Sequence, residues 1–248
     1  MQGDFCDLLL FLERLCMFEF TANEWVAIEL SLRIAFLATI AALPFAVAAA
    51  YALARLTFPG KAIVDSVLHL PLVLPPVVTG YMLLLAFGKR GPIGAFLFDH
   101  FGISLSFRWT GAALACAVMG FPLMLRAIRL SFESIDRRLE AAAGTLGANG
   151  RWTFLLVTLP LSLPGILAGA IMCFAKALGE FGATITFVSN IPGETQTIAS
   201  SIYSYTQVPG GESGALRLTM ISIAIALIAL VTSEFLNRRV QRRIAVFE

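Results

Sequence analysis

The sequence predicts an all-α membrane protein, a helical bundle with about five transmembrane helices. Hydrophobic residues make up 58% of the 248 residues, and only 14% are charged. Five stretches contain no Asp, Glu, Lys or Arg: 34–54, 70–88, 109–125, 152–175 and 218–233. Their lengths are close to the roughly 20 helical residues that cross a bilayer. Their apolar residues follow one another without the two-residue alternation of barrel strands, which favours helices.

The two ends of the chain differ from this apolar middle. We expect residues 1–24 to form an N-terminal extension, 25–236 the transmembrane domain and 237–248 a basic cytoplasmic tail. The apolar run at residues 8–12 is too short to span a membrane. The extension also lacks the features of a cleaved signal peptide, so we expect the first span to act as the membrane signal. We further expect residues 1–16 to be dispensable, so that a chain started at Met17 keeps its function.

The distribution of Lys and Arg predicts the orientation, because cytoplasmic loops are enriched in these residues. With five spans, the two ends of the chain lie on opposite sides of the membrane. A cytoplasmic carboxyl terminus puts eleven of the 18 basic residues inside: Arg55, Lys61, Arg126, Arg129, Arg137, Arg138, Arg151, Arg238, Arg239, Arg242 and Arg243. We therefore predict a periplasmic amino terminus and a cytoplasmic carboxyl terminus.

The longest cytoplasmic loop, about residues 126–151, contains a short segment with helix-forming residues. Three alanines at 141–143 favour a helix, and Gly144 and Gly147 favour its end. Nine residues after Gly147, the chain reads Val157-Thr158-Leu159-Pro160. On loop composition alone, the segment also fits a passive connector along the inner membrane face.

This spacing resembles the permease subunits of binding-protein-dependent ABC importers. Their signature loop reads Glu-Ala-Ala, three residues, Gly, nine residues, Ile-x-Leu-Pro. Here Ala141 stands where that pattern has its glutamate, and Glu140 lies one residue earlier. Val157 replaces the isoleucine. The resemblance implies that the following residues form the loop that couples the chain to an ATPase: Glu140, Ala141, Ala142, Ala143, Gly147, Arg151, Leu159 and Pro160.

Three further blocks resemble the molybdate and sulfate permeases of the same family. They are ALGEFGATITFVSNIPGETQTI at 177–198, HLPLVLPPVV at 69–78 and TQVPGGESG at 206–214. The similarity covers about residues 25–236. It implies the transmembrane fold of a type I ABC importer and ATP-driven import of molybdate. Sulfate, thiosulfate and tungstate are the alternative cargoes.

The chain has no sequence motif for hydrolysing ATP. Neither Gly60-Lys61 nor Gly88-Lys89 belongs to a Gly-x-x-x-x-Gly-Lys-Ser/Thr loop. We therefore expect no enzyme activity and no cofactor in this chain, with ATP used by a partner. The resemblance implies two cytoplasmic ATP-binding cassette subunits and a periplasmic molybdate-binding protein. Because five spans are too few to enclose a path, a second copy of the chain is also expected. Membrane lipid surrounds the bundle, and no nucleic-acid partner is expected.

Two charged residues at the end of the fourth charge-free stretch mark a candidate translocation path. Lys176 and Glu180 are four residues apart, on one face of a continuing helix. Charges within a membrane usually pair or line a polar cavity, and hydroxyl and amide groups suit a passing oxyanion. The candidate path residues are Lys176, Glu180, Gly182, Thr184, Thr186, Ser189 and Asn190. Alternatively, the charged pair simply anchors the helix end at the interface.

Two other classes of function are open. An intramembrane enzyme would use Glu180 and a histidine such as His69 as acid and base, but the two residues are expected at opposite sides of the membrane. A passive anion channel would pass its ion without ATP.

Within the spans, prolines such as Pro75 and Pro76 predict kinks, and Gly165-x-x-x-Gly169 predicts close helix packing without identifying the partner surface.

Overall fold

The computed structural model describes residues 20–244, with side chains described to Thr232 and at Phe235. This part of the chain is helical and contains no strand. The predicted extension therefore lies almost wholly outside the described residues, as do Met17 and the last four residues. The helices are α2 (Ala22–Arg55), α3 (Lys61–Val73), α4 (Pro76–Phe87), α5 (Pro92–Phe101), α6 (Trp109–Ser134), α7 (Arg137–Thr145), α8 (Gly150–Thr153), the π-helical turn η1 (Phe154–Thr158), α9 (Leu159–Leu178), α10 (Gly182–Val188), α11 (Ile198–Thr206) and α12 (Glu212–Ile244).

Four helical segments within residues 20–244 are long and apolar enough to cross a membrane. They are Ala22–Arg55, Trp109–Ser134, Gly150–Leu178 and Glu212–Thr232. A fifth candidate is the pair α3 and α4, whose axes are bent by 113° at the break between them. The structure thus confirms the prediction of an all-α bundle with about five transmembrane helices.

The first span begins twelve residues before the charge-free stretch that predicted it. Thr21 and Glu24 form a capping box: the Thr21 hydroxyl accepts from the Glu24 N–H, and the Glu24 carboxylate accepts from the Thr21 N–H. Glu24 is only 1% exposed, and its carboxylate lies 2.9 Å from the Arg217 guanidinium. A charge can sit inside this helix because it is paired, which is why a search for uncharged runs placed the helix start too late.

The second charge-free stretch, 70–88, is not one continuous helix. α3 begins at Lys61 and ends at Val73, and α4 starts at Pro76. Two successive prolines explain the break, because Pro75 and Pro76 have no N–H to donate and Pro disfavours a helical conformation in the residue before it. Pro76 then occupies the first turn of α4, where a missing N–H costs little.

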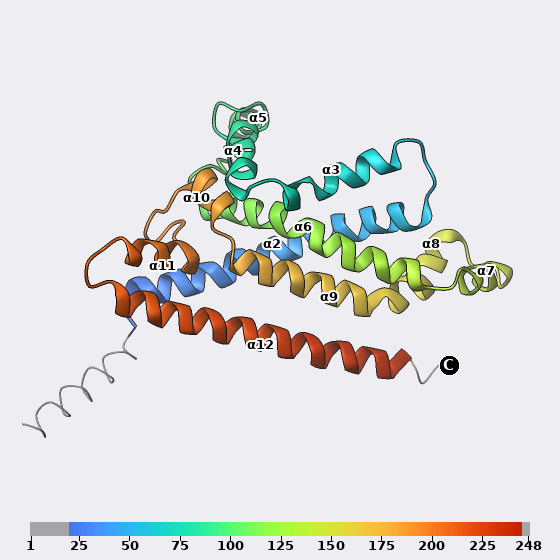
Figure 1. Ribbon diagram of the computed structural model, residues 1–248. Coiled ribbons are helices and arrows are strands. Elements are labelled where there is room, and N and C mark those ends of the chain that lie inside the picture. The colour runs from blue at the N-terminus through green and yellow to red at the C-terminus, as the bar shows by residue number, and fades with distance from the viewer. Residues whose placement is uncertain (1–19, 245–248) are drawn as a thin grey trace, which may run out of the picture.

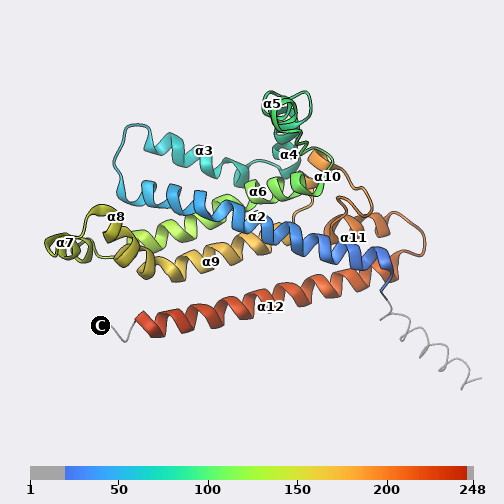
Figure 2. The same ribbon diagram turned by 180° about the vertical axis from the view of Figure 1, so that it is seen from behind.

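The long helices α2, α6, α9 and α12 run alongside one another (Figure 1). Figure 2 shows the same arrangement from behind, with α7, α8 and the carboxyl-terminal end of α12 at one end of the bundle. α10 and α11 lie toward the other end, and α4 and α5 project from the side. The predicted coupling segment and the carboxyl-terminal end of α12 are therefore on the same side of the bundle. α12 also continues without interruption through 237–244, so the predicted tail begins as part of this helix.

Small side chains allow α6 and α9 to pack closely. A Cβ on Gly165 would lie 2.2 Å from the Ser131 Cβ, and one on Gly169 would lie 2.9 Å from the Met124 carbonyl oxygen. Gly120 of α6 is equally close to α9, since its added Cβ would lie 2.5 Å from the Cys173 Sγ. The Gly165-x-x-x-Gly169 pattern thus serves packing inside this chain, between two helices that both cross the bundle.

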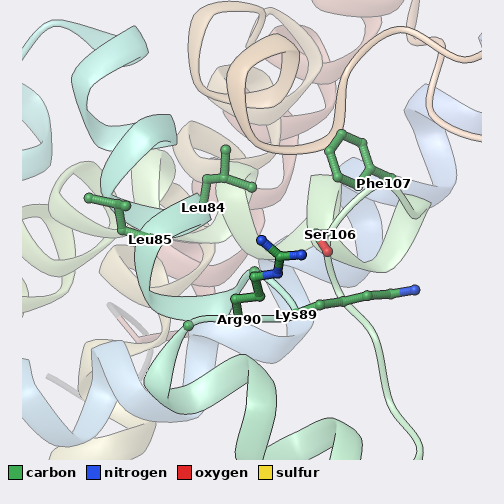
Figure 3. Close-up of a pocket in the computed structure, with 8 residues that line it drawn as sticks. Leu84, Leu85, Lys89, Arg90, Ser106 and Phe107 are labelled. Atoms are coloured by element: carbon green, nitrogen blue, oxygen red, sulfur yellow. The ribbon is translucent and has the colours of Figure 1, made fainter.

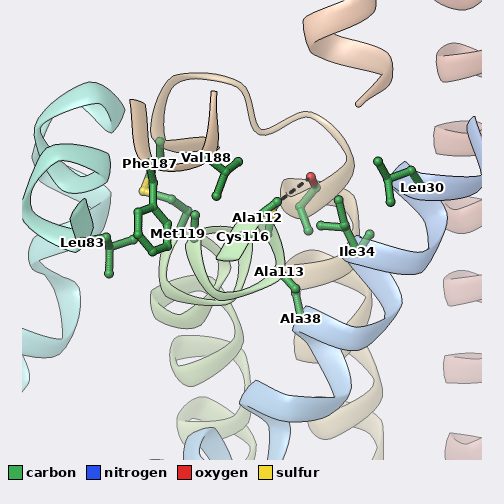
Figure 4. Packing of buried hydrophobic residues seen from close by; sticks show 14 residues of the cluster. Leu30, Ile34, Ala38, Leu83, Ala112, Ala113, Cys116, Met119, Phe187 and Val188 are labelled. Atoms are coloured by element: carbon green, nitrogen blue, oxygen red, sulfur yellow. Dashed lines mark hydrogen bonds between the residues drawn. The ribbon is translucent and has the colours of Figure 1, made fainter. Parts of the chain in front are cut away.

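Three apolar clusters fill the space between the helices of the described residues. One of them joins α2, α4, α6 and α10 and includes Ile34, Leu83, Met119 and Phe187 (Figure 4). In this cluster the Cys116 thiol donates to the Ala177 carbonyl at 3.6 Å. The outer surface is apolar as well: on α12, Met220, Leu227 and Ile228 are each more than half exposed. Such a surface suits contact with lipid chains.

Candidate coupling loop and translocation path

The coupling segment is a separate short helix at one end of the bundle. Asp136 caps α7 by accepting a hydrogen bond from the Arg138 N–H at 2.9 Å. Ala141, Ala142 and Arg151 are exposed, as are Leu139, Leu146 and Trp152, which are 50%, 89% and 56% exposed. Large apolar side chains exposed on a polar helix favour contact with another protein.

The end of α7 depends on glycine. Gly147 has a φ of +88°, in the left-handed region that side chains with a Cβ rarely adopt. Its N–H donates to the Gly144 carbonyl, and the next N–H, of Ala148, donates to the Ala143 carbonyl. This pair of bonds is the Schellman motif, so Gly147 fixes the direction in which the chain leaves α7. Asn149 then caps α8 by accepting from the Trp152 N–H.

Glu140 points inward and joins three elements. Its Oε1 lies 2.9 Å from the Arg55 Nη2 at the end of α2, and it accepts a hydrogen bond from the Thr158 hydroxyl at 2.9 Å. The same Arg55 nitrogen donates to the Ile135 carbonyl just before α7. The Arg55 side chain is 8% exposed and that of Glu140 is 21% exposed. We call Arg55, Glu140 and Thr158 the coupling junction, since they connect α7 to the ends of two long helices.

A π-helical turn lies where α7 and α8 lead into the spanning helix. In this turn the Leu159 N–H donates to the Phe154 carbonyl, five residues earlier. Pro160 follows directly, and because it has no N–H it leaves the carbonyl four residues before it without the usual partner. Leu159 is half-buried against the apolar core, whereas Pro160 is exposed. Wider turns of this kind are common at functional sites.

The second group of candidate residues lies around the end of α9. The helix ends at Leu178, so Glu180 lies beyond it, yet Lys176 Nζ still lies 2.7 Å from the Glu180 Oε2. The other carboxylate oxygen of Glu180 accepts from the Ala183 N–H at 2.9 Å in the first turn of α10. The Glu180 side chain is 1% exposed and that of Lys176 is 29% exposed. One carboxylate thus connects α9 to α10.

The threonines of α10 point their hydroxyl hydrogens at their own helix. The Thr184 hydroxyl donates to the Phe181 carbonyl at 2.9 Å, and Thr184 is 2% exposed. The Thr186 hydroxyl donates to the Gly182 carbonyl at the same distance, and Thr186 is half-buried. Gly182 itself lies close to α4, where its added Cβ would be 2.8 Å from the Pro76 Cβ. Only the Gly182 contact brings α10 against α4, and the path role of the three residues stays a prediction.

Beyond α10, the chain turns through Ser189 and Asn190. Ser189 is exposed and has a φ of +66°, and its carbonyl accepts from the Thr195 hydroxyl at 3.2 Å. The Asn190 Nδ2 donates to the Ser204 hydroxyl of α11 at 2.7 Å, whereas its Oδ1 is buried without a partner. The side-chain Oδ1 of Asn190 is therefore an unused acceptor, while its Nδ2 already donates one hydrogen bond.

The acid–base pair of the enzyme alternative is not brought together. The His69 Nδ1 lies 2.9 Å from the Asp65 carbonyl oxygen within α3. Glu180 contacts Lys176 and Ala183 instead. Asp65 is also bound by Arg129 of α6 at 2.9 Å, so His69 belongs to a polar group that connects α3 to α6.

Comparison with known proteins places this arrangement in a family. Residues 42–246 match the model of the binding-protein-dependent transport system inner membrane component. The chain belongs to this family. The chain is 62% identical over 219 residues to a molybdenum transport system permease protein of Escherichia coli K12, covering 88% of this chain and 95% of the relative. It is 54% identical to the protein of the same description from Haemophilus influenzae, covering 89% and 96%.

Solved structures of inner membrane components share the fold. A bacterial ABC transporter that imports the acidic polysaccharide alginate superposes with a TM-score of 0.69. The match covers 94% of this chain and 83% of that one, at 17% sequence identity. At this identity the likeness concerns the fold alone. The family match confirms the resemblance that the signature loop suggested. The structural match confirms the fold of a type I importer.

Sequence reasoning missed two members of the coupling junction in this inner membrane component. Arg55 appeared only as a cytoplasmic charge, and Thr158 only as the variable position of the Val157-Thr158-Leu159-Pro160 motif. Arg55 ends a span and therefore lies on the predicted coupling side, which was a usable signal. No local pattern indicated Thr158, because its partner lies on a different helix.

The coupling junction gives a stability prediction. Replacing Glu140 with Gln leaves the buried Arg55 guanidinium without its counter-charge, so Glu140→Gln should lower the free energy of unfolding by about 1–3 kcal/mol. Glu133→Gln is the matched control, because Glu133 pairs with Arg129 at 2.8 Å but is 41% exposed, and it should cost less than about 1 kcal/mol. Denaturant titration in detergent micelles measures both. Equal losses would show that the Glu140–Arg55 contact is no stronger than a surface pair.

Proposed function

We propose that this chain is the permease subunit of an ATP-driven molybdate importer. The observation that carries the proposal is the 62% identity to a molybdenum transport permease over 88% of this chain. Two copies of the chain form the path for the oxyanion, two ATP-binding cassette subunits hydrolyse ATP on the cytoplasmic side, and a periplasmic molybdate-binding protein delivers the cargo. The amino terminus is periplasmic and the carboxyl terminus cytoplasmic.

The shape of the coupling end supports the ATPase part of this proposal. α7, the turn after it and α8 offer the exposed apolar side chains Leu139, Leu146 and Trp152 to a partner. On its inner side, Glu140 of the coupling junction connects α7 to Arg55 of α2 and to Thr158 before α9. A partner that moves α7 therefore displaces the ends of both α2 and α9. In this mechanism ATP binding draws the two coupling helices together, the helices rock, and the path alternates between its outward and inward openings.

The charged pair at the end of α9 supports a path near α10. Two unit charges about 4 Å apart attract by about 4 kcal/mol at an effective dielectric of 20, so an unpaired Lys176 would hold a divalent anion too firmly for transport. Glu180 moderates that charge. Because the Thr184 and Thr186 hydroxyls already donate to backbone carbonyls, they are left as weak acceptors, and Lys176 is the cation that the anion meets.

Gly147 provides a test of coupling through shape. No atom lies within 4 Å of a Cβ added at Gly147, so a substitution acts only through its positive φ. We expect Gly147→Val to insert normally but to lose most molybdate uptake, because a β-branched residue cannot hold the left-handed turn that ends α7. Uptake of labelled molybdate and co-purification of the ATPase measure the effect.

Arg151→Glu is the control for Gly147→Val, since it alters a charge in the same loop without altering the turn. It should retain most of its uptake. Normal uptake and normal ATPase co-purification by Gly147→Val would remove the reason for placing the interface at α7.

The balance of charge between Lys176 and Glu180 gives a second test. Glu180→Gln keeps an acceptor for the Ala183 N–H but leaves Lys176 unpaired, so it should lower uptake more than Thr186→Val does. The double variant Lys176→Gln, Glu180→Gln removes both charges and should recover part of the loss. Initial uptake rates, scaled to the amount of inserted protein, measure this. If the double variant is no better than Glu180→Gln alone, Glu180 acts only by joining α9 to α10.

A further inference from the structure

A basic cavity lies at the corner between α4, α5 and the loop that enters α6. Its volume is about 380 Å³, and it is lined by Leu84, Lys89, Arg90, Ser106 and Phe107 among others (Figure 3). α4 and α5, which border the cavity, project from the bundle beside α10 and far from α7 (Figure 1). In the proposed orientation it therefore opens toward the periplasm, the side from which cargo arrives.

The cavity carries positive charge without a balancing carboxylate. Both Lys89 and Arg90 are exposed, and no acidic side chain lines the cavity. In the part of the chain that the structure describes, Arg90 forms no salt bridge. The Lys89 ammonium lies 5.6 Å from the centre of the Phe98 ring. In Figure 3 the Arg90 side chain points toward Ser106, whereas Lys89 points away from it. An unpaired guanidinium in such a cavity attracts an anion.

Ser106 supplies a second polar group of the kind that an anion needs. It is 4% exposed and lines the cavity, yet its hydroxyl makes no hydrogen bond to the residues between 20 and 244. Among the described residues, the Ser106 Oγ does not belong to the buried side-chain atoms that lack a partner, so this oxygen is accessible from the cavity. A ligand oxygen in the cavity would accept the free O–H of Ser106 beside the Arg90 guanidinium.

The backbone holds this corner in one shape. A Cβ on Gly94 would lie 2.0 Å from the Gly88 carbonyl oxygen, so the turn that presents Lys89 and Arg90 packs directly on α5. Gly111 does the same for the other side, where its added Cβ would lie 2.0 Å from the Leu105 carbonyl oxygen. Phe107 has a φ of +60°, which is rare for an aromatic residue. Strained backbone of this kind is found mainly where function requires it.

We propose that this cavity is a weak binding site for a tetrahedral oxyanion, where the cargo first contacts the permease. Arg90 supplies the charge, the Ser106 hydroxyl donates a hydrogen bond, and Lys89 raises the local concentration of anions from the periplasmic side. The inference rests on the proposed function for the identity of the cargo. Weak binding follows from the exposure of Arg90, since water screens its charge, and it suits a site that must release its ion.

A cysteine at the mouth of the cavity tests the site without relying on transport. Phe107 is 51% exposed, so Phe107→Cys can be modified in proteoliposomes that contain the permease with its ATPase. The rates of modification by an anionic and a cationic methanethiosulfonate are measured with sodium molybdate, tungstate or sulfate, and with sodium chloride at matched ionic strength. The chain without Phe107→Cys gives the background from the native cysteines.

We expect molybdate to slow modification by both reagents, while sodium chloride at the same ionic strength does not. Adding Arg90→Gln should weaken this protection about tenfold, the effect of one charge-assisted hydrogen bond, and should lower the ratio of anionic to cationic rates. Ser106→Ala should weaken protection by a smaller factor. Arg108→Gln is the matched control: it removes an exposed cation of the same loop that does not line the cavity, and it should leave protection unchanged.

Three results would overturn the site. The first is that none of the three oxyanions protects Phe107→Cys, and the second is that Arg90→Gln and Arg108→Gln have equal effects. The third is protection only by an added binding protein, which would make the cavity a docking surface for an acidic side chain. Failure of the proposed function looks different: the wild-type complex would take up no molybdate, while oxyanions would still protect Phe107→Cys in a manner that depends on Arg90.

Discussion

Close packing of α2, α6 and α9 is the constraint on which the rest of the structure depends. In a bilayer, burial of apolar surface does not drive helices together, because lipid chains are as apolar as the side chains. The helices associate through close contact instead, and here Gly120, Gly165 and Gly169 bring α6 and α9 within a distance that no side chain would permit. Alanines such as Ala46 and Ala50 on α2 are fully buried for the same reason. The result is a compact bundle to which the other elements attach.

Buried ion pairs then connect the bundle at both ends. Glu140 binds Arg55 at the end that carries α7, and Glu24 binds Arg217 at the opposite end. Each pair joins segments that are far apart in the sequence, so each fixes one helix end relative to another. A buried pair costs much free energy when one partner is lost, which makes these contacts specific. The two pairs thereby fix the ends of α2 relative to α7 and α12.

Much of the fold could be predicted from the sequence, because lipid imposes long uncharged helices and the charge-free stretches report them. The start of α2 could not, since Glu24 and Arg33 interrupt the apolar run and only the structure shows their partners, Arg217 and the Trp109 ring. The break at Pro75 and Pro76 changed a predicted span into two helices bent by 113°. A local rule missed the start of α2 because a distant residue pairs with Glu24, whereas the kink at Pro75 and Pro76 follows from the prolines themselves.

The candidate site shows the same division. The spacing around Gly147 predicted the short helix α7 and its end, because a helix end that needs a positive φ leaves a glycine in the sequence. The coupling role of this segment stays a prediction. The inward direction of Glu140 was not predictable, since Arg55 and Thr158 come from other elements. The Thr184 hydroxyl looked available in the sequence, but it donates to its own helix. Ser106 and Arg90 matched no motif, and only the folded chain brings them to one cavity.

ATP hydrolysis and molybdate uptake, measured together in proteoliposomes, test the central claim most directly. The vesicles contain this chain with its native ATPase, and the binding protein is added outside. The account predicts that molybdate enters only when ATP is present in the vesicle lumen, on the side of the membrane where the ATPase lies. It also predicts that molybdate-loaded binding protein raises the rate of ATP hydrolysis. Molybdate flux that needs no ATP would contradict the account and identify a passive channel. Uptake of sulfate but not of molybdate under the same conditions would contradict the proposed cargo.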